Sequence, residues 1–331
     1  MNILIIGIGS IGKRHITNLI NLGYNRLVLV SRSGNVGESL KHFPCYSETK
    51  LAIENHQITH AFVCTPTSKH LIDLTILVDK NIQNIYLEKP VSDNFEGIDE
   101  LISVSKNFKR FVVGYDLHFD PGLNKVKQLI QDKVIGNILS ANAFVGQYLP
   151  DWRPYEDHRK GMSGSIEKGG GVLLDLIHEF DYIRWLLGTP IQIASIIQHN
   201  PCLEIETEDL ADVLIKFENN CTATIHLDYH QKKLVRNCII TGTNGTIKWD
   251  LFLNQVDWID KYKEEQSFSY KNFERNDRYI SILKAFMNEN EFEERLVNLN
   301  DALISLKMVL AAKKSSESKI FINLNSFNPI I

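Results

Sequence analysis

The sequence Gly7-Ile8-Gly9-Ser10-Ile11-Gly12 lies between an apolar run at residues 2–6 and a segment, residues 13–20, whose apolar side chains have helical spacing. The apolar run predicts a buried parallel strand, and the segment predicts a helix. Strand, glycine turn and helix in this order are typical of the phosphate-binding turn of a Rossmann unit. The glycines allow a tight bend, backbone approach to a pyrophosphate and close helix–strand packing, and the helix N-terminus offers N–H groups to phosphates. We therefore predict a dinucleotide site here; the alternative is a tight turn that binds no ligand.

Composition restricts the class of protein. The chain has 331 residues, enough for two domains, with a net charge of −4 and 44% hydrophobic residues. This balance gives no general attraction to nucleic acid or anionic membranes. No apolar run has the length of a membrane span, and the N-terminus lacks the pattern of a signal peptide. We expect a cytoplasmic protein with neither a nucleic-acid nor a membrane partner.

The cysteines argue against a disulfide framework or a zinc site. They are odd in number, scattered and without a C-x-x-C pair, at Cys45, Cys64, Cys202, Cys221 and Cys238. Reduced cysteines that pack as small hydrophobic residues are the expected state in the cytoplasm. We predict no metal site.

Two patterns of elements divide the chain. Up to about residue 120, strands and helices alternate, which predicts a doubly wound parallel sheet with strands at 26–30, 60–64, 84–87 and 111–115 and helices at 71–79 and 95–105. Beyond it, apolar and polar residues alternate around turn signals, which predicts antiparallel strands with one buried face, at 138–145, 191–197, 212–217, 221–228 and 246–251. Helices are expected there at 123–130, 173–187, 279–287 and 302–313. The expected fold is α/β, with an N-terminal Rossmann domain at 1–120 and a C-terminal α+β domain at 121–331 that has a large, mostly antiparallel sheet.

Further motifs carry a family resemblance over nearly the whole chain. Beside the glycine turn they are Thr65-Pro66 with His70, Glu88-Lys89-Pro90, Gly114-Tyr115 with Phe119 and Pro121, Gly169-Gly170-Gly171 with Asp175, and Gly242-Thr243-Asn244-Gly245-Thr246. In these the chain resembles the glucose–fructose oxidoreductase/inositol dehydrogenase (Gfo/Idh/MocA) family. The resemblance implies a nicotinamide cofactor, carbohydrate-like substrates, an open-faced C-terminal sheet and homo-oligomers, here a homodimer or homotetramer, that pair through this sheet.

Lys89 is the first candidate catalytic residue. It follows a predicted buried strand at the edge where nicotinamide and substrate should lie. An ammonium group there would stabilise charge that develops on a substrate oxygen during hydride transfer. Glu88 would hold it in place. A structural Glu–Lys pair is the alternative, and the resemblance favours catalysis.

Asp175 and His178 are the second candidate pair. Three residues apart on one predicted helix, they would share a face as a general acid/base pair. The family usually places the histidine four residues after the aspartate, and here that position is Glu179. Either His178 or Glu179 is therefore the proton donor; the remaining alternative for His178 is a helix-packing role.

Substrate contacts are expected from the loop 148–159 and from the end of the predicted strand at 111–115. Arginine side chains suit a carboxylate or phosphate on the substrate, although surface arginines on an ordered loop are an equal alternative. We assign these contacts to Tyr115, Trp152, Arg153 and Arg159. Asp116 and His118 replace asparagine and arginine that the family often has, so substrate specificity does not carry over.

The end of the second strand bears on cofactor choice. It has no acidic residue to bind the ribose of NAD, and Arg32 between Ser31 and Ser33 suits a 2′-phosphate. We therefore favour NADP(H) over NAD(H); an arginine that stacks on adenine, which would accept NAD, is the alternative. The full cofactor-binding set is Gly7, Gly9, Ser10, Ile11, Gly12, Ser31, Arg32, Ser33, Cys64, Thr65, Pro66, His70, Glu88 and Lys89.

The function predicted from these residues is hydride transfer between a nicotinamide and a hydroxyl or ketone of a sugar, cyclitol or nucleotide sugar. A reductase of a non-sugar carbonyl or double bond, similar to biliverdin reductase, is the second enzyme hypothesis. A catalytically silent dinucleotide sensor is the hypothesis from another class, and the presence of Lys89 and Asp175 argues against it, since a sensor needs neither.

Overall fold

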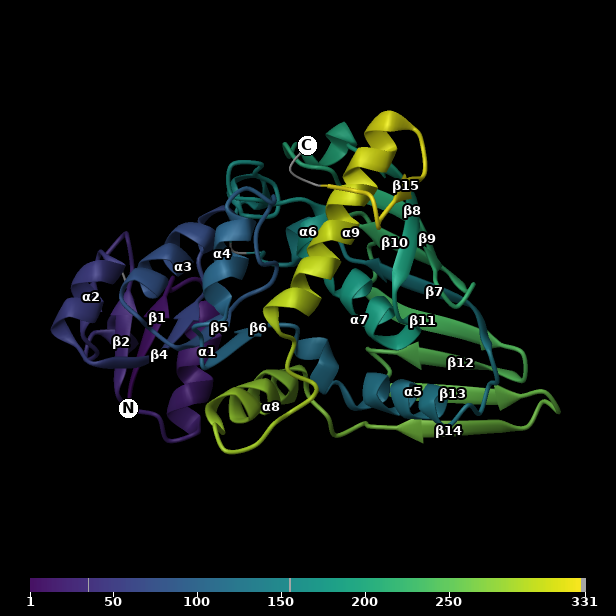
Figure 1. The fold of residues 1–331 in the computed structure, drawn as a ribbon, viewed down its shortest axis with the longest axis horizontal. Coiled ribbons are helices and arrows are strands. Elements are labelled where there is room, and N and C mark those ends of the chain that lie inside the picture. Colours follow the sequence, from purple (N-terminus) through teal and green to yellow (C-terminus); the bar gives the residue numbers. More distant parts are fainter. Residues whose placement is uncertain (35, 155, 329–331) are drawn as a thin grey trace. The chain divides into compact units, whose positions relative to one another are not determined.

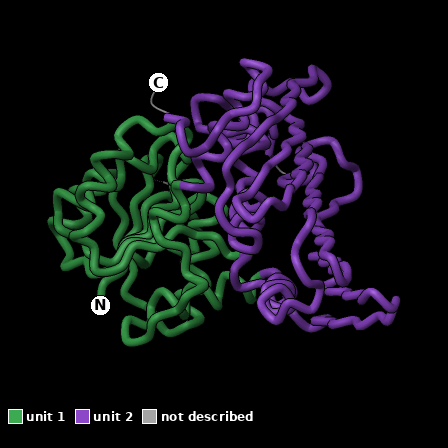
Figure 2. Tube along the Cα trace, turned by 45° about the vertical axis from the view of Figure 1, so that its right-hand side comes forward, with its two compact units in different colours: residues 1–116, 276–303 green, residues 117–275, 304–331 purple. Residues whose placement is uncertain are grey.

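The computed structural model describes residues 1–34, 36–154 and 156–328. Contacts divide the chain into two compact units, one of residues 1–116 and 276–303 and the other of residues 117–275 and 304–331 (Figure 2). The single boundary predicted at residue 120 does not include the return of 276–303 to the first unit.

Within the described part of the first unit, six parallel strands form one sheet in the order β3-β2-β1-β4-β5-β6. Their bounds are β1 Asn2–Ile6, β2 Leu27–Val30, β3 Cys45–Tyr46, β4 Ile58–Val63, β5 Asn84–Leu87 and β6 Arg110–Val113. Strands β1, β2 and β5 are buried almost throughout, as their apolar runs predict. The doubly wound parallel sheet is confirmed, and all six carboxyl ends meet at one edge.

Helices cover both faces of this sheet (Figure 1). They are α1 Ser10–Asn21, α2 Thr49–Asn55, α3 His70–Asp79, α4 Ile98–Ser105 and, from the returning segment, α8 Arg275–Met287. Right-handed crossovers place α1 on one face and α2, α3 and α4 on the other. Helix α8 lies beside α1, where Asn276 and Asn18 exchange hydrogen bonds of 2.9 and 3.1 Å. The sequence patterns predicted neither β3 nor α2, which are two and seven residues long.

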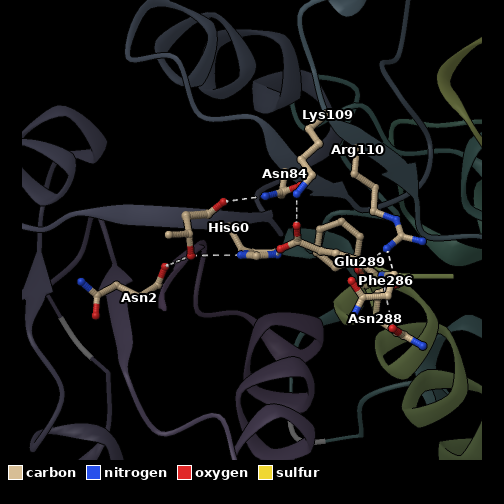
Figure 3. Close-up of polar contacts among 10 residues, drawn as sticks. Asn2, His60, Asn84, Lys109, Arg110, Phe286, Asn288 and Glu289 are labelled. Atoms are coloured by element: carbon tan, nitrogen blue, oxygen red, sulfur yellow. Dashed lines mark hydrogen bonds and ion pairs between the residues drawn. The ribbon is translucent and has the colours of Figure 1, made fainter.

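Polar contacts attach the segment after α8 to the amino-terminal edge of the sheet (Figure 3). The carboxylate of Glu289 lies 3.2 Å from His60 Nε2 on β4 and also pairs with Lys109. Arg110 donates to the carbonyl oxygens of Phe286, Asn288 and Glu291 at 2.6–3.1 Å. These contacts between residues far apart in the chain are the physical reason that 276–303 belongs to the first unit.

Among the residues described in the second unit, nine strands form a mostly antiparallel sheet in the order β14-β13-β12-β11-β7-β10-β9-β8-β15, with a parallel β7–β10 pair. The strands are β7 Ile138–Gly146, β8 Pro190–Gln198, β9 Leu210–Phe217, β10 Thr222–Asp228, β11 Val235–Gly242, β12 Gly245–Asp250, β13 Gln255–Asp260, β14 Glu265–Ser269 and β15 Ile322–Asn323. Buried residues alternate with exposed or partly exposed residues along β9, as the apolar–polar alternation predicts. Asn220, at φ +64°, makes the predicted turn between β9 and β10.

The helices of the second unit are α5 Pro121–Gln131, α6 Val172–Asp175, α7 His178–Leu187 and most of α9 Leu299–Ser318. Asp120 caps α5 by accepting from Leu123 N–H at 3.0 Å, and proline occupies its first turn. The helix predicted at 173–187 is two helices, because α6 ends at Asp175 and Glu179 N–H bonds to Leu176 three residues back rather than four. Asp175 and His178 therefore do not share one regular helix.

Candidate functional site

The glycine turn follows β1 at the carboxyl edge of the parallel sheet. Gly7 has φ +92°, and a Cβ there would lie 2.7 Å from the backbone of Cys64; at Gly12 it would lie 2.1 Å from the Gly7 oxygen. Both positions therefore require glycine, for the tight bend and for the close approach of α1. At Gly9 a Cβ would meet no atom within 4 Å. Steric packing inside the protein does not require glycine there, and the position leaves room for a ligand.

Helix α1 begins at Ser10 with Gly9 as its N-cap residue. Since glycine has no side chain, the first N–H groups of the helix receive no side-chain cap from this position. A helix terminus of this kind attracts anions through those N–H groups and the positive end of the helix dipole. Together with the open space at Gly9, the residues present fit a pyrophosphate.

The ends of β2 and β4 are joined by an acid that the sequence reasoning missed. Arg32 Nη2 lies 3.2 Å from Asp73 Oδ1, and Thr65 Oγ1 donates to Asp73 Oδ2 at 2.7 Å. Asp73 is buried in the first turn of α3, and burial raises the pKa of its carboxyl. Ser31 and Ser33 lie beside Arg32 with their hydroxyl oxygens 3.2 Å apart. Arg32 itself remains about half exposed, so a ligand can reach its guanidinium.

His70 connects the loops that follow β4 and β5. Its Nδ1 lies 2.8 Å from the Pro90 oxygen and its Nε2 lies 2.9 Å from the Thr65 oxygen. The ring is buried, and burial lowers the pKa of His70. Its two ring nitrogens thus contact backbone rather than open space. Cys64, also buried, lies against Gly7 behind the turn, and burial raises the pKa of its thiol.

Glu88 and Lys89 directly follow β5 at the same edge. Glu88 is buried, and its Oε1 lies 2.6 Å from Nε2 of His15, a fully buried residue of α1. Lys89 is partly exposed. The glycine-turn helix and the strand that carries Lys89 are thus tied together by one short side-chain contact. The sequence reasoning did not predict the role of His15. The available signal was that His15 lies three residues after Gly12, on the buried face of α1.

A second group of predicted site residues lies within the other unit. Asp175 is buried at the end of α6 and accepts a hydrogen bond of 2.7 Å from the hydroxyl of Tyr229. Burial and the neighbouring Asp175 charge raise the pKa of Tyr229 well above its usual range, so this hydroxyl keeps its proton. Trp152 packs edge-on against the Tyr229 ring with centroids 5.4 Å apart. Tyr229, just after β10, was not predicted from the sequence.

His178 and Glu179 occupy different environments at the start of α7. Glu179 has no exposed surface and accepts two hydrogen bonds from the Arg236 guanidinium, at 2.8 and 3.0 Å. His178 is buried except for a 7% exposed fraction. The carboxylate of Glu179 is thus committed to a buried, bidentate ion pair.

The predicted substrate loop holds its two arginines differently. Arg159 pairs with Asp157 at 2.8 Å and with Glu204 at 2.7 Å, so two carboxylates already balance its positive charge. Arg153 lies 3.9 Å from Glu156 and lines a recess with Leu149, Trp152, Glu156, His158, Gly161 and Ser163. Tyr155, between them, lies outside the described residues.

The remaining residues considered from the sequence are buried. Tyr115 has no exposed surface, and Asp116 pairs with Arg278 of α8 at 2.9 Å. His118 lies 2.8 Å from Asp181 and stacks on Trp185 with centroids 4.2 Å apart. Asp116 and His118 thus each belong to a buried pair within their own unit. In the part of the chain that the structure describes, no helix has the length and apolar character to span a membrane.

Two models of one protein family match this chain, one in each of its two units. A family model described as "Oxidoreductase family, NAD-binding Rossmann fold" matches residues 1–115, and one described as "GFO/IDH/MocA C-terminal domain" matches residues 123–248. Myo-inositol 2-dehydrogenase of Thermotoga maritima is 25% identical over 342 residues, with 98% of each chain covered.

Solved structures share the fold. Myo-inositol 2-dehydrogenase from Lactobacillus plantarum superposes with a TM-score of 0.81 at 22% identity, over 98% of this chain and 99% of that one. Levoglucosan dehydrogenase in complex with NADH and levoglucosan gives a TM-score of 0.84 at 16% identity, over 98% and 99%.

Proposed function

Since the chain belongs to the Gfo/Idh/MocA family of NAD-binding oxidoreductases, we propose that it transfers a hydride between a nicotinamide cofactor and a hydroxyl or ketone of a sugar, cyclitol or nucleotide sugar. The observation that carries the proposal is the placement of Lys89 directly after β5, at the sheet edge where the glycine turn also lies. Relatives named for myo-inositol and levoglucosan support a polyol or sugar as substrate.

The cofactor would bind at the carboxyl edge of the parallel sheet. The N–H groups at the start of α1 and the open backbone at Gly9 would hold the pyrophosphate, with Ser10, Ile11 and Thr65-Pro66 around it. The bound nicotinamide supplies or accepts the hydride. His70 positions this edge through its contacts with the Thr65 and Pro90 carbonyls.

Lys89 would act on the substrate oxygen. Its ammonium group would donate a hydrogen bond to this oxygen, which has alkoxide character before a hydride leaves its carbon and gains that character when a hydride arrives. The buried contact between Glu88 and His15 limits the freedom of the backbone from which Lys89 extends. This is positioning through a neighbour, and it gives His15 a role that the sequence reasoning did not consider.

Asp175 and His178 would carry the proton. An imidazole donates and accepts protons near neutral pH, whereas the Glu179 carboxylate is held by Arg236. We therefore assign the acid/base role to His178. Tyr229 keeps its proton and donates it in a hydrogen bond to Asp175, which holds this carboxylate in one orientation.

NADP(H) is the proposed cofactor. The support is the exposed guanidinium of Arg32 between two serines at the end of β2. Asp73 opposes it, because its carboxylate competes for the same guanidinium.

A homodimer or homotetramer through the open face of the second sheet is the proposed assembly. Large apolar side chains project from that face, with 65% of Ile196, 39% of Leu214 and 37% of Ile239 exposed. Light scattering on the wild type and on Ile196→Asp tests it: a fall in mass in the variant supports the assembly, and a monomeric wild type contradicts it.

The experiment for the function is a screen of sugars, cyclitols and nucleotide sugars with NADP⁺ and NAD⁺, followed by the absorbance of the reduced nicotinamide. We expect turnover with at least one polyhydroxylated substrate, abolished in Asp175→Asn. Tight cofactor binding without turnover of any oxidised or reduced member of the panel would instead identify a dinucleotide sensor.

A further inference from the structure

A thiol, an imidazole and a carboxylate lie in line at a place that the oxidoreductase site does not use. Cys202 Sγ is 3.8 Å from Nδ1 of His230, and Nε2 of the same ring is 3.3 Å from Oδ1 of Asp209. All three residues belong to the second unit. Cys202 lies in a short 3₁₀ turn, Pro201–Leu203, and is exposed.

The carboxylate at the inner end is fixed from several directions. Asp209 has no exposed surface and lies just before β9. Its oxygens accept from the backbone N–H of Asn200 at 2.7 Å and from the Asn200 side-chain amide at 2.8 Å. These bonds also anchor the start of the turn that carries Cys202. The thiol is therefore held near the imidazole by the same acid that faces the other ring nitrogen.

The backbone that carries the imidazole is fixed by a hydrogen bond to Asp228. His230 follows β10, and its N–H donates to Asp228 Oδ1 at 2.7 Å. The preceding residue, Tyr229, directs its hydroxyl to Asp175 instead. The two neighbouring side chains thus contact different carboxylates, Asp175 for Tyr229 and Asp209 for His230.

A nucleophile next to a base that a third group orients is the arrangement that activates a side chain for attack. Thiolates form beside histidines, and the thiolate is the form that reacts. We propose that Cys202 is an activated nucleophilic thiol, and that His230 and Asp209 make it a site of covalent modification by small soft electrophiles.

The reaction with an alkylating electrophile shows the balance. The sulfur of Cys202 forms a bond to the methylene carbon of iodoacetamide, the carbon–iodine bond breaks and iodide leaves with its electron pair. The thiol proton moves to His230 Nδ1, and the resulting imidazolium faces the carboxylate of Asp209. No oxidation or reduction occurs.

Cys45 provides an internal control, because it is the other exposed cysteine among the described residues. Its Sγ faces the Tyr46 carbonyl oxygen at 4.0 Å rather than a base, and partial burial raises the pKa of its thiol. A thiol without a base is only a few per cent thiolate at pH 7. Since His230 can accept the thiol proton during the attack, it should accelerate the reaction of Cys202 by roughly tenfold.

The experiment measures alkylation rates of Cys202 and Cys45 in the same reduced full-length protein with iodoacetamide at pH 7, by peptide mass spectrometry. The same ratio in the denatured protein removes intrinsic sequence effects. We expect Cys202 to react roughly tenfold faster than Cys45 in the folded protein only. Equal rates in the folded protein would overturn the proposal.

Variants then test the base. His230→Gln should lower the Cys202 rate to that of Cys45 without changing the Cys45 rate. His199→Gln is the matched control, since His199 lies in the same region but contacts the Ile205 carbonyl at 2.8 Å. Circular dichroism establishes that each variant is folded. A Cys202 rate unchanged in folded His230→Gln, or lowered equally by His199→Gln, contradicts the assignment; should His230→Gln not fold, the folded-to-denatured ratio in the wild type decides.

Discussion

Glu179 is completely buried and accepts two hydrogen bonds from one guanidinium, that of Arg236 on β11, at 2.8 and 3.0 Å. The pair joins the first turn of α7 to the sheet within one unit. Glu179 stands where the family usually has its histidine, and this contact gives it a structural task. We propose that His178, one residue earlier, has the acid/base role.

We expect opposite effects from substitutions at these neighbours. Glu179→Gln leaves the Arg236 charge without its counter-ion, which should cost about 3–5 kcal/mol of unfolding free energy while the folded enzyme stays active. His178→Ala should slow turnover by about 10²–10⁴-fold and remove a step near neutral pH from the rate profile. Denaturant unfolding and kcat/KM as a function of pH measure both. A folded Glu179→Gln protein that is crippled, beside an active His178→Ala, would make Glu179 the acid.

Gly9 and Gly12 offer a matched pair in the phosphate turn. Gly12→Ala should lower thermal stability, because its Cβ would lie 2.1 Å from the Gly7 oxygen. Gly9→Ala should unfold near the wild-type temperature, because its Cβ meets nothing within 4 Å, yet bind the cofactor more weakly. Thermal unfolding and cofactor fluorescence titration separate the two effects. Wild-type affinity in Gly9→Ala would place the pyrophosphate elsewhere.

Arg32 and Asp73 should have opposite effects on cofactor choice. NADPH is expected to bind more tightly than NADH, by about 1.5–3 kcal/mol from one charge-assisted contact, and Arg32→Ala should remove the difference. Asp73→Asn should increase the preference for NADPH by about 0.2–1 kcal/mol, because it removes a competing partner of a half-exposed guanidinium. Titration of both cofactors measures these ratios. If NADH binds as tightly as NADPH and Arg32→Ala changes neither, Arg32 does not contact a phosphate.

Stability should fall in mild acid because of His60. Burial lowers the pKa of His60 from its ordinary 6.5, although the charge of Glu289 opposes the shift. The unfolded chain therefore binds this proton first, so the contribution of His60 to stability is complete above about pH 6.5 and is lost as the pH falls through its folded-state pKa. Glu289 stays ionised in this range, since its hydrogen bond from Lys109 lowers its pKa.

Melting temperatures at about pH 7.5 and 5.5 check this expectation. The wild type should lose more on acidification than His60→Gln, whereas the exposed His42→Gln should behave as the wild type does. An equal loss in the wild type and His60→Gln would show that other groups cause the acid sensitivity.

Local sequence patterns predicted the glycine turn and the alternating strands, because contacts between residues a few positions apart determine these parts of the structure. The glycine turn requires its residues for backbone reasons that operate within a few positions, as the geometry at Gly7 and Gly12 shows. Strand β9 alternates because one face is buried, and the pattern is visible in eight residues. A two-residue strand such as β3 has no period to recognise.

Contacts between distant residues escaped prediction. His15 and Glu88 are 73 positions apart, and Arg32 and Asp73 are 41 apart, so no spacing rule connects them. The return of 276–303 to the first unit depends on Glu289 meeting His60 and Lys109. The ion pair between Glu179 on α7 and Arg236 on β11 is also a contact between distant residues. It bears most on the choice of His178 or Glu179 as the proton donor.

The central claim is that this protein is a nicotinamide-dependent oxidoreductase with catalysis at the end of β5. Substitution of Lys89 tests this claim most directly. The measurement is kcat/KM of Lys89→Met on the best substrate of the screen, beside the cofactor dissociation constant of the same protein. The account predicts wild-type cofactor affinity with kcat/KM lower by at least about 10²-fold, the usual loss for one electrostatic stabiliser. Near-normal kcat/KM in folded Lys89→Met would contradict it.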